Sequence, residues 1–78
     1  MNELVGKRLD EYIIVAVYED MWYNGIVIGY KWEDNHETWA TWYYSKNECE
    51  LKFRHVGMTE KEAIEDFLDR IKNLMVVG

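Results

Sequence analysis

The strands that this sequence predicts are apolar on both of their faces, and this doubling limits the folds open to the chain. Every residue from Tyr12 to Tyr18 is apolar or aromatic, so side chains on both sides of that strand need cover. The same doubling recurs in 26–30 and 39–44. β-Branched and aromatic residues of this kind favour strands. The chain is therefore expected to build a sheet with two faces to shelter.

Four such runs, separated by turn signals, predict an antiparallel meander with strands near 11–19, 25–33, 37–45 and 48–56. Asn24 and Gly25 are suited to the two positive φ angles of a tight hairpin turn, and the segments 33–37 and 45–47 are polar breaks. In the fourth run Leu51 and Phe53 alternate with charged residues, so one face of that strand is expected to meet water.

A helix is predicted over 59–75, because Thr59 and Glu62 have the spacing of a capping box. Six apolar residues at the helical period form one stripe that is expected to pack on the sheet: Ile64, Phe67, Leu68, Ile71, Leu74 and Met75. The predicted fold class is α+β, a four-stranded antiparallel β-meander with one C-terminal amphipathic α-helix packed on one face. We expect a single domain over 1–78, with a leader segment at 1–10, the sheet at 11–56 and the helix at 59–75.

Composition disfavours several classes of partner. Fifteen acidic and nine basic side chains give a net charge of −6, the wrong sign for a phosphate backbone, so direct nucleic-acid binding is not expected. The longest apolar run is a strand's length, far below the ~20 residues of a membrane helix, so no membrane segment is expected. Cys49 is the single cysteine, which favours a reducing compartment and a cytoplasmic location.

Residues that carry chemistry are sparse and scattered. His36 and His55 are far apart in the sequence, and no paired-cysteine, His-x-x-x-His or calcium-loop spacing occurs, so neither a metal nor a cofactor is predicted. Cys49 and His55 lie about 20 Å apart on a straight strand, too far to meet directly. The sequence therefore predicts a non-catalytic protein.

The aromatic residues are more numerous than one helix can cover. Four strands span ~19 Å and a helix ~10 Å, so part of the aromatic set is expected on an exposed face that binds another protein, with a homodimer as the simplest form. The other interpretation is that curvature folds the sheet around its own core and the N-terminal segment covers the remainder. The predicted interaction residues are Tyr12, Tyr18, Trp22, Tyr30, Trp32, Trp42 and Tyr44.

The acidic side chains allow an alternative function, a nucleic-acid mimic or inhibitor of the phage or mobile-element type that blocks a nucleic-acid-binding protein. These charges could equally serve only to solvate the domain. Stacking of single-stranded bases on sheet aromatics is a third interpretation, but it lacks the usual basic groove. The candidate acidic residues are Glu19, Asp20, Glu33, Asp34, Glu37, Glu62, Glu65, Asp66 and Asp69.

Overall fold

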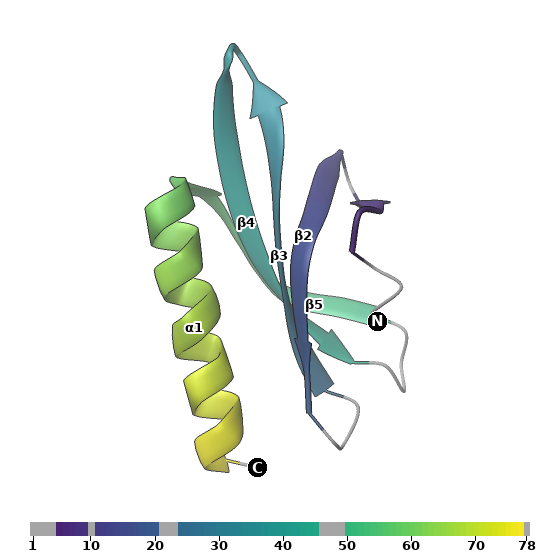
Figure 1. Ribbon diagram of the computed structural model, residues 1–78, viewed down its shortest axis with the longest axis vertical. Coiled ribbons are helices and arrows are strands. Elements are labelled where there is room, and N and C mark those ends of the chain that lie inside the picture. The colour runs from purple at the N-terminus through teal and green to yellow at the C-terminus, as the bar shows by residue number, and fades with distance from the viewer. Residues whose placement is uncertain (1–4, 10, 21–23, 46–49, 78) are drawn as a thin grey trace.

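Each strand of the sheet pairs with the strand that follows it in the sequence. The structure is a computed structural model that describes residues 5–9, 11–20, 24–45 and 50–77. Within those ranges one antiparallel sheet has the order β1-β2-β3-β4-β5, and a C-terminal helix packs on it (Figure 1). The predicted α+β class is confirmed. The elements are β1 (Arg8–Leu9), β2 (Tyr12–Glu19), β3 (Asn24–Glu33), β4 (His36–Ser45), β5 (Glu50–Met58) and α1 (Glu60–Val77).

The described residues form five strands, one more than predicted, because the expected leader segment contributes β1. Arg8 pairs with Ile13 and Leu9 with Tyr12, which places this short strand on the outer side of β2. Glu11 makes the return with a φ of 71°. A two-residue strand is too short to show alternation, and a glutamate with positive φ is not a recognisable turn signal. The pattern of the sequence therefore could not reveal β1.

The hairpin turns agree with the prediction at one place and differ at another. Asp34 and Asn35 have φ values of 52° and 65° between the paired residues Glu33 and His36, as a two-residue hairpin turn requires. Asn24 and Gly25 were expected to form a turn, and this is wrong because β3 begins at Asn24. Glycine is needed at position 25 for space, since a Cβ there would collide with the Tyr18 carbonyl oxygen.

The helix begins where its capping box predicts. Thr59 N donates to Glu62 Oε1 at 3.0 Å, and Glu62 N donates to Thr59 Oγ1 at 3.2 Å. These reciprocal bonds satisfy two amide groups that a helix N-terminus otherwise leaves unpaired. α1 then runs from Glu60 to Val77, two residues beyond the predicted end.

The helix is rotated relative to its predicted apolar stripe. Ala63 is fully buried against the sheet, whereas Ile64 is 44% and Leu68 58% exposed. The prediction that these two residues face the sheet is wrong. Phe67 does pack on the core, and the side chain of Met75 lies outside the described set. A small residue at the contact lets the helix approach the strands closely, so part of the apolar stripe remains in solvent.

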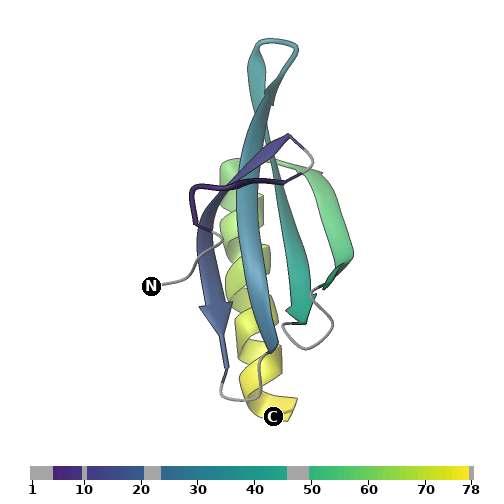
Figure 2. The same cartoon turned by 90° about the vertical axis from the view of Figure 1, so that its right-hand side faces the viewer.

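Side chains are buried on both faces of the sheet. Under α1, Ile28 and Trp39 pack with Ala63. A second cluster on the opposite face contains Tyr12, Ile14, Val27, Ala40 and Trp42, with Leu9 of β1 packed against it. Figures 1 and 2 show why this face is closed: β1 lies across it and β5 runs obliquely from that side toward the helix.

β5 departs from the regular alternation that was predicted for it. Phe53 has a φ of 54°, and the pairing of β4 with β5 changes register twice. These irregularities turn Phe53 outward, so that it is 72% exposed, with its ring at 6.2 Å from that of Tyr43. The prediction of one sheltered face along this strand is therefore wrong at Phe53.

Candidate interaction surface

Two of the predicted interaction residues are core residues. Tyr12 is 4% and Trp42 3% exposed, and their rings meet edge to face with centroids 5.1 Å apart. The Lys31 ammonium group lies 4.9 Å from the Tyr12 ring centre, on the polar side of this pair. The prediction that Tyr12 and Trp42 lie on an exposed face is wrong, because sheet curvature and Leu9 shelter them.

The remaining predicted aromatics differ in exposure. Tyr18, Tyr30 and Tyr44 are half-buried, and Trp32 is 66% exposed. The Tyr30 ring stacks on Trp39 with centroids 5.1 Å apart, so most of its area already belongs to the core under α1. Trp22 lies outside the described residues. Within this set, Trp32 and Tyr18 have the exposed ring surface that a partner can contact.

Apolar side chains from three elements lie on the helix side of the sheet, where α1 packs mainly on β3 and β4. Ile13 and Tyr18 pair with Tyr30 and Ile26, so they point to the helix side of the sheet. Trp32 lies two residues beyond Tyr30 on that same side. We call the following set the β2–α1 surface: Ile13 and Tyr18 of β2, Trp32 of β3, and Ile64 and Leu68 of α1.

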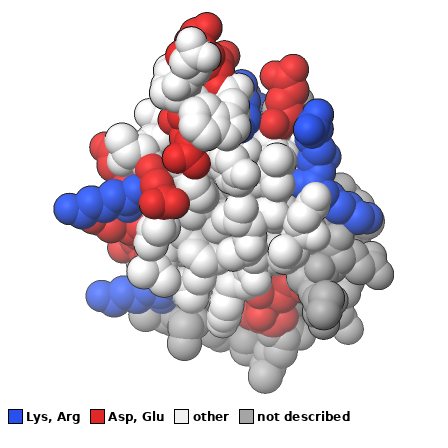
Figure 3. Space-filling model, turned by 45° about the horizontal axis from the view of Figure 1, so that its top comes forward, with Lys and Arg blue, Asp and Glu red and all other residues white. Residues whose placement is uncertain are grey.

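The position of Ile64 and Leu68 follows from helical geometry. Asp66 and Arg70 contact β4 and β5, and at 100° per residue Ile64 and Leu68 lie about 160° around the helix from Asp66. They therefore project away from β5, toward β2. Figure 3 views this side, and uncharged side chains occupy its centre while most charged groups lie around the margin. A patch of this kind is a feature of binding surfaces.

Sequence reasoning missed most of this surface. Ile13, Ile64 and Leu68 are apolar residues that the pattern assigns to a core, and the rotation of α1 exposes the two helical ones. The available signal was Ala63, a small residue at helical spacing from Phe67 and Arg70. A contact face through Ala63, Phe67 and Arg70 would have left Ile64 and Leu68 outside.

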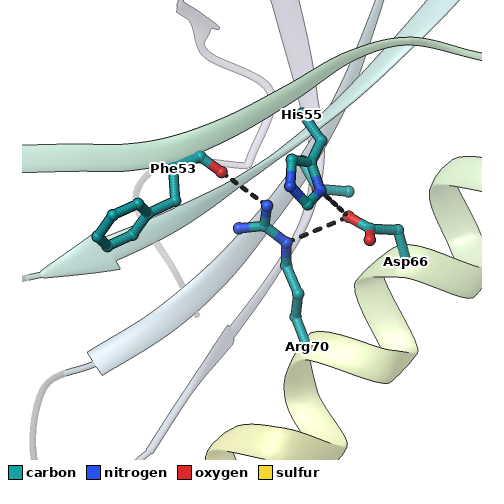
Figure 4. Close-up of polar contacts among 5 residues, drawn as sticks. Phe53, His55, Asp66 and Arg70 are labelled. Atoms are coloured by element: carbon teal, nitrogen blue, oxygen red, sulfur yellow. Dashed lines mark hydrogen bonds and ion pairs between the residues drawn. The ribbon is translucent and has the colours of Figure 1, made fainter.

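A polar cluster fixes the opposite side of the helix to the sheet (Figure 4). One carboxylate oxygen, Asp66 Oδ2, accepts a bond from Thr41 Oγ1 at 2.5 Å and from Arg70 Nε at 3.1 Å, and lies 3.0 Å from His55 Nδ1. Arg70 also donates to the Phe53 carbonyl oxygen at 2.6 Å. Bonds to a charged group are among the stronger ones in proteins. The cluster therefore sets how α1 is rotated.

The charge state of Asp66 follows from the same contacts. Partial burial raises the pKa of this carboxyl group, but the hydrogen bonds from Thr41 and His55 and the charge of Arg70 outweigh that effect. The net result is a pKa below the usual 3.8. Asp66 is therefore ionised at neutral pH, and its carboxylate contacts link α1 to the sheet.

The candidate acidic residues do not form one array. Asp20 accepts a bond from Asn24 N at 2.9 Å, and Glu62 and Asp66 serve the helix cap and the polar cluster. Glu33 pairs with Lys31 at 3.7 Å. The others are exposed at separate places: Glu19 at the end of β2, Asp34 and Glu37 at the β3–β4 hairpin, and Glu65 and Asp69 on α1.

An open hollow of about 580 Å³ lies on the face away from α1. Its lining contains both acidic and basic side chains: Glu11 and Glu33 lie with Lys31 and Arg54 around Tyr12. Mixed charge of this kind favours no ligand class. Among the described residues no group of His, Cys, Asp and Glu side chains has the arrangement of a metal site.

Comparison with known proteins finds no relative of this chain. No family model matches the chain, and neither the curated proteins nor the solved structures contain a match. Within the described ranges no helix combines the length and apolarity needed to cross a membrane.

Proposed function

We propose that this chain is a non-catalytic protein-interaction module that binds through the β2–α1 surface. The observation that carries the proposal is the exposure of apolar side chains there: Trp32 is 66%, Leu68 58% and Ile64 44% exposed. Large apolar side chains gathered on one side of a small domain are typical of a contact surface. The acidic mimic is less well supported, because the acidic side chains are dispersed and several of them form contacts within the fold.

The area available sets the expected strength of binding. Full burial of a large apolar side chain contributes about 1.5–3 kcal/mol, and these side chains are already partly buried, so the surface contributes on the order of 5 kcal/mol. Association costs about 4–15 kcal/mol in lost freedom of motion. Apolar contact alone therefore gives weak binding, and a stable complex needs further hydrogen bonds or ion pairs.

Affinity capture with Leu68→Lys tests the proposal. Leu68 is exposed, so the substitution should change the free energy of unfolding by less than about 0.5 kcal/mol. Asp69→Asn is the matched control, because it makes the same change of one charge at the neighbouring exposed position. Proteins captured from the native host are quantified by mass spectrometry at low and high salt.

The proposal expects a partner that wild type and Asp69→Asn retain at high salt and that Leu68→Lys loses at least about tenfold. Equal capture by all three forms would show that this surface does not bind. A partner that every form releases at high salt would instead favour the acidic mimic.

A further inference from the structure

The end of the β3–β4 hairpin projects beyond the rest of the described sheet. The pairing of β2 with β3 reaches Tyr30, and the pairing of β5 with β4 reaches Trp39. Past these two residues β3 and β4 pair with each other up to the turn at Asp34 and Asn35. Figures 1 and 2 show the hairpin extending above β2 and α1. The helix therefore does not cover the end of the hairpin.

Trp32 and Glu37 lie opposite each other on the helix side of this hairpin end. Tyr30 and Trp39 pair and pack under α1, so Trp32 and Glu37, which pair two residues further along, project to the same side. Side chains directly opposite in an antiparallel pair have Cβ atoms about 4.5–5.5 Å apart. Trp32 is 66% exposed, and Glu37 is exposed as well. An indole ring and a carboxylate group are thus neighbours in solvent.

The other face of the hairpin shows what such a pair of groups binds. There the Lys31 ammonium group lies 4.9 Å from the centre of the Tyr12 ring and 3.7 Å from Glu33 Oε2. The face of an aromatic ring attracts a cation through its quadrupole, and a carboxylate attracts it by charge. On this face the chain itself supplies the ring, the cation and the carboxylate.

On the helix side the chain supplies the ring and the carboxylate without a cation. Lys31 is directed to Tyr12 on the opposite face, and Arg70 is bonded to Asp66. In the part of the chain that the structure describes, no basic side chain forms an ion pair with Glu37. The net charge of −6 also leaves more carboxylates than the chain has basic groups. A cation that completes this arrangement therefore comes from another molecule.

We propose that a partner protein places an arginine side chain on the Trp32 indole and pairs its guanidinium group with Glu37. This inference rests on the proposed function and names the chemistry of the partner at the β2–α1 surface. A planar guanidinium group stacks on an indole and donates to a carboxylate at the same time, whereas the ammonium group of lysine is compact and strongly hydrated. Tryptophan is also the aromatic residue that attracts a cation most strongly.

The arginine contact supplies the ion pair that the apolar surface lacks. Glu37 is two strand residues from Trp39, which pairs with Met58 just before α1, and Ile64 lies one helical turn into α1. Trp32 and Ile64 are thus on the order of 10–15 Å apart, a gap that about four extended residues span. One short segment of a partner therefore covers both. Stacking of the guanidinium group also buries ring area, which salt does not screen, so the complex persists at high salt.

Selection of peptides tests the proposal. Phage that display short random peptides are selected on the immobilised full chain, and the enriched peptides are synthesised and measured by isothermal titration calorimetry. Their arginine is then replaced by lysine or by citrulline, which keeps the shape of arginine without its charge. The protein variants are Trp32→Leu, which keeps an apolar side chain without a ring, and Glu37→Gln, which removes only the charge. Glu65→Gln is the matched control, because it makes the same change at an exposed position of α1.

The expected result is a set of peptides that share an arginine. Citrulline in the peptide, Trp32→Leu and Glu37→Gln should each weaken binding at least about threefold, while Glu65→Gln binds like wild type. Citrulline combined with Glu37→Gln should lose less affinity than the two separate changes predict, because both remove the same ion pair. Circular dichroism verifies that each variant is folded.

Several results would overturn the arginine contact. They are a selection that enriches no peptide or peptides without arginine, lysine peptides that bind as tightly as arginine peptides, and losses from citrulline and Glu37→Gln that are strictly additive in free energy.

Leu68→Lys separates this inference from the proposed function. Peptides that lose affinity for Leu68→Lys but not for Glu37→Gln use the β2–α1 surface without the arginine contact, so the proposed function stands and the inference fails. Peptides that bind Leu68→Lys as tightly as wild type contradict the proposed function itself. If the selection enriches no peptide, the capture experiment with Leu68→Lys still decides the proposed function separately.

Discussion

Thr41 on β4 and Asp66 on α1 are joined by a hydrogen bond of 2.5 Å from the hydroxyl to the carboxylate, across the boundary between helix and sheet. Thr41 is fully buried, so water cannot replace its partner. This bond lies on the side of α1 opposite the β2–α1 surface. The contact that fixes the helix is thus a cause of the exposure of Ile64 and Leu68.

Removal of either partner of this bond should destabilise the fold. Thr41→Val and Asp66→Ala are each expected to lower the free energy of unfolding by about 1–2 kcal/mol. The double variant should lose less than the sum, because both changes remove the same bond. Urea denaturation measures the three values, with exposed Asp69→Ala as control. Strict additivity would mean that the bond contributes nothing.

Acid should weaken wild type more than a variant without this carboxylate. The pKa of Asp66 is lower in the folded protein than its usual 3.8, so its stabilising contribution is present above that value and disappears as the pH falls through the folded pKa. Unfolding free energies at about pH 5 and pH 3 should therefore fall further in wild type than in Asp66→Asn. Equal losses in the two proteins would show that the Asp66 pKa is not depressed by folding.

Gly29 should not tolerate a side chain. An added Cβ would lie 2.7 Å from the Ile13 carbonyl oxygen on the neighbouring strand, and backbone there cannot move aside freely. Gly29→Ala is expected to lower the free energy of unfolding by roughly 1–3 kcal/mol. Gly57→Asn serves as control, because asparagine tolerates its φ of 74° and nothing lies within 4 Å of the added Cβ. Urea midpoints that are equal for Gly29→Ala and wild type would contradict this packing.

The helix cap should contribute measurably to stability. Thr59→Ala removes the hydroxyl that accepts the Glu62 amide bond and should cost about 1 kcal/mol, while Thr59→Ser should restore most of the loss. Thermal unfolding followed by circular dichroism distinguishes the two variants. A serine variant as unstable as the alanine variant would assign the loss to packing of the threonine methyl group.

Element types and order could be predicted because their signals are local. The capping spacing of Thr59 and Glu62 and the polar hairpin at Asp34 and Asn35 act within a few residues, and the structure contains both. β1 escaped prediction because its two residues are ordered by pairing with β2 rather than by a pattern of their own.

The candidate surface was less predictable because it depends on tertiary geometry. Tyr12 and Trp42 were expected outside, but curvature of the sheet encloses them. Ile64 and Leu68 were expected inside, but Asp66 and Arg70 have bonding partners on the sheet, and these bonds turn the helix. A polarity pattern assigns charged residues to solvent by default, so it selects the wrong face when a charged pair holds the contact.

Salt-resistant affinity capture tests most directly whether the β2–α1 surface is a contact surface. The account predicts that wild type and Asp69→Asn retain a partner at high salt, while Leu68→Lys loses it at least about tenfold. Equal capture by all three proteins would contradict the account.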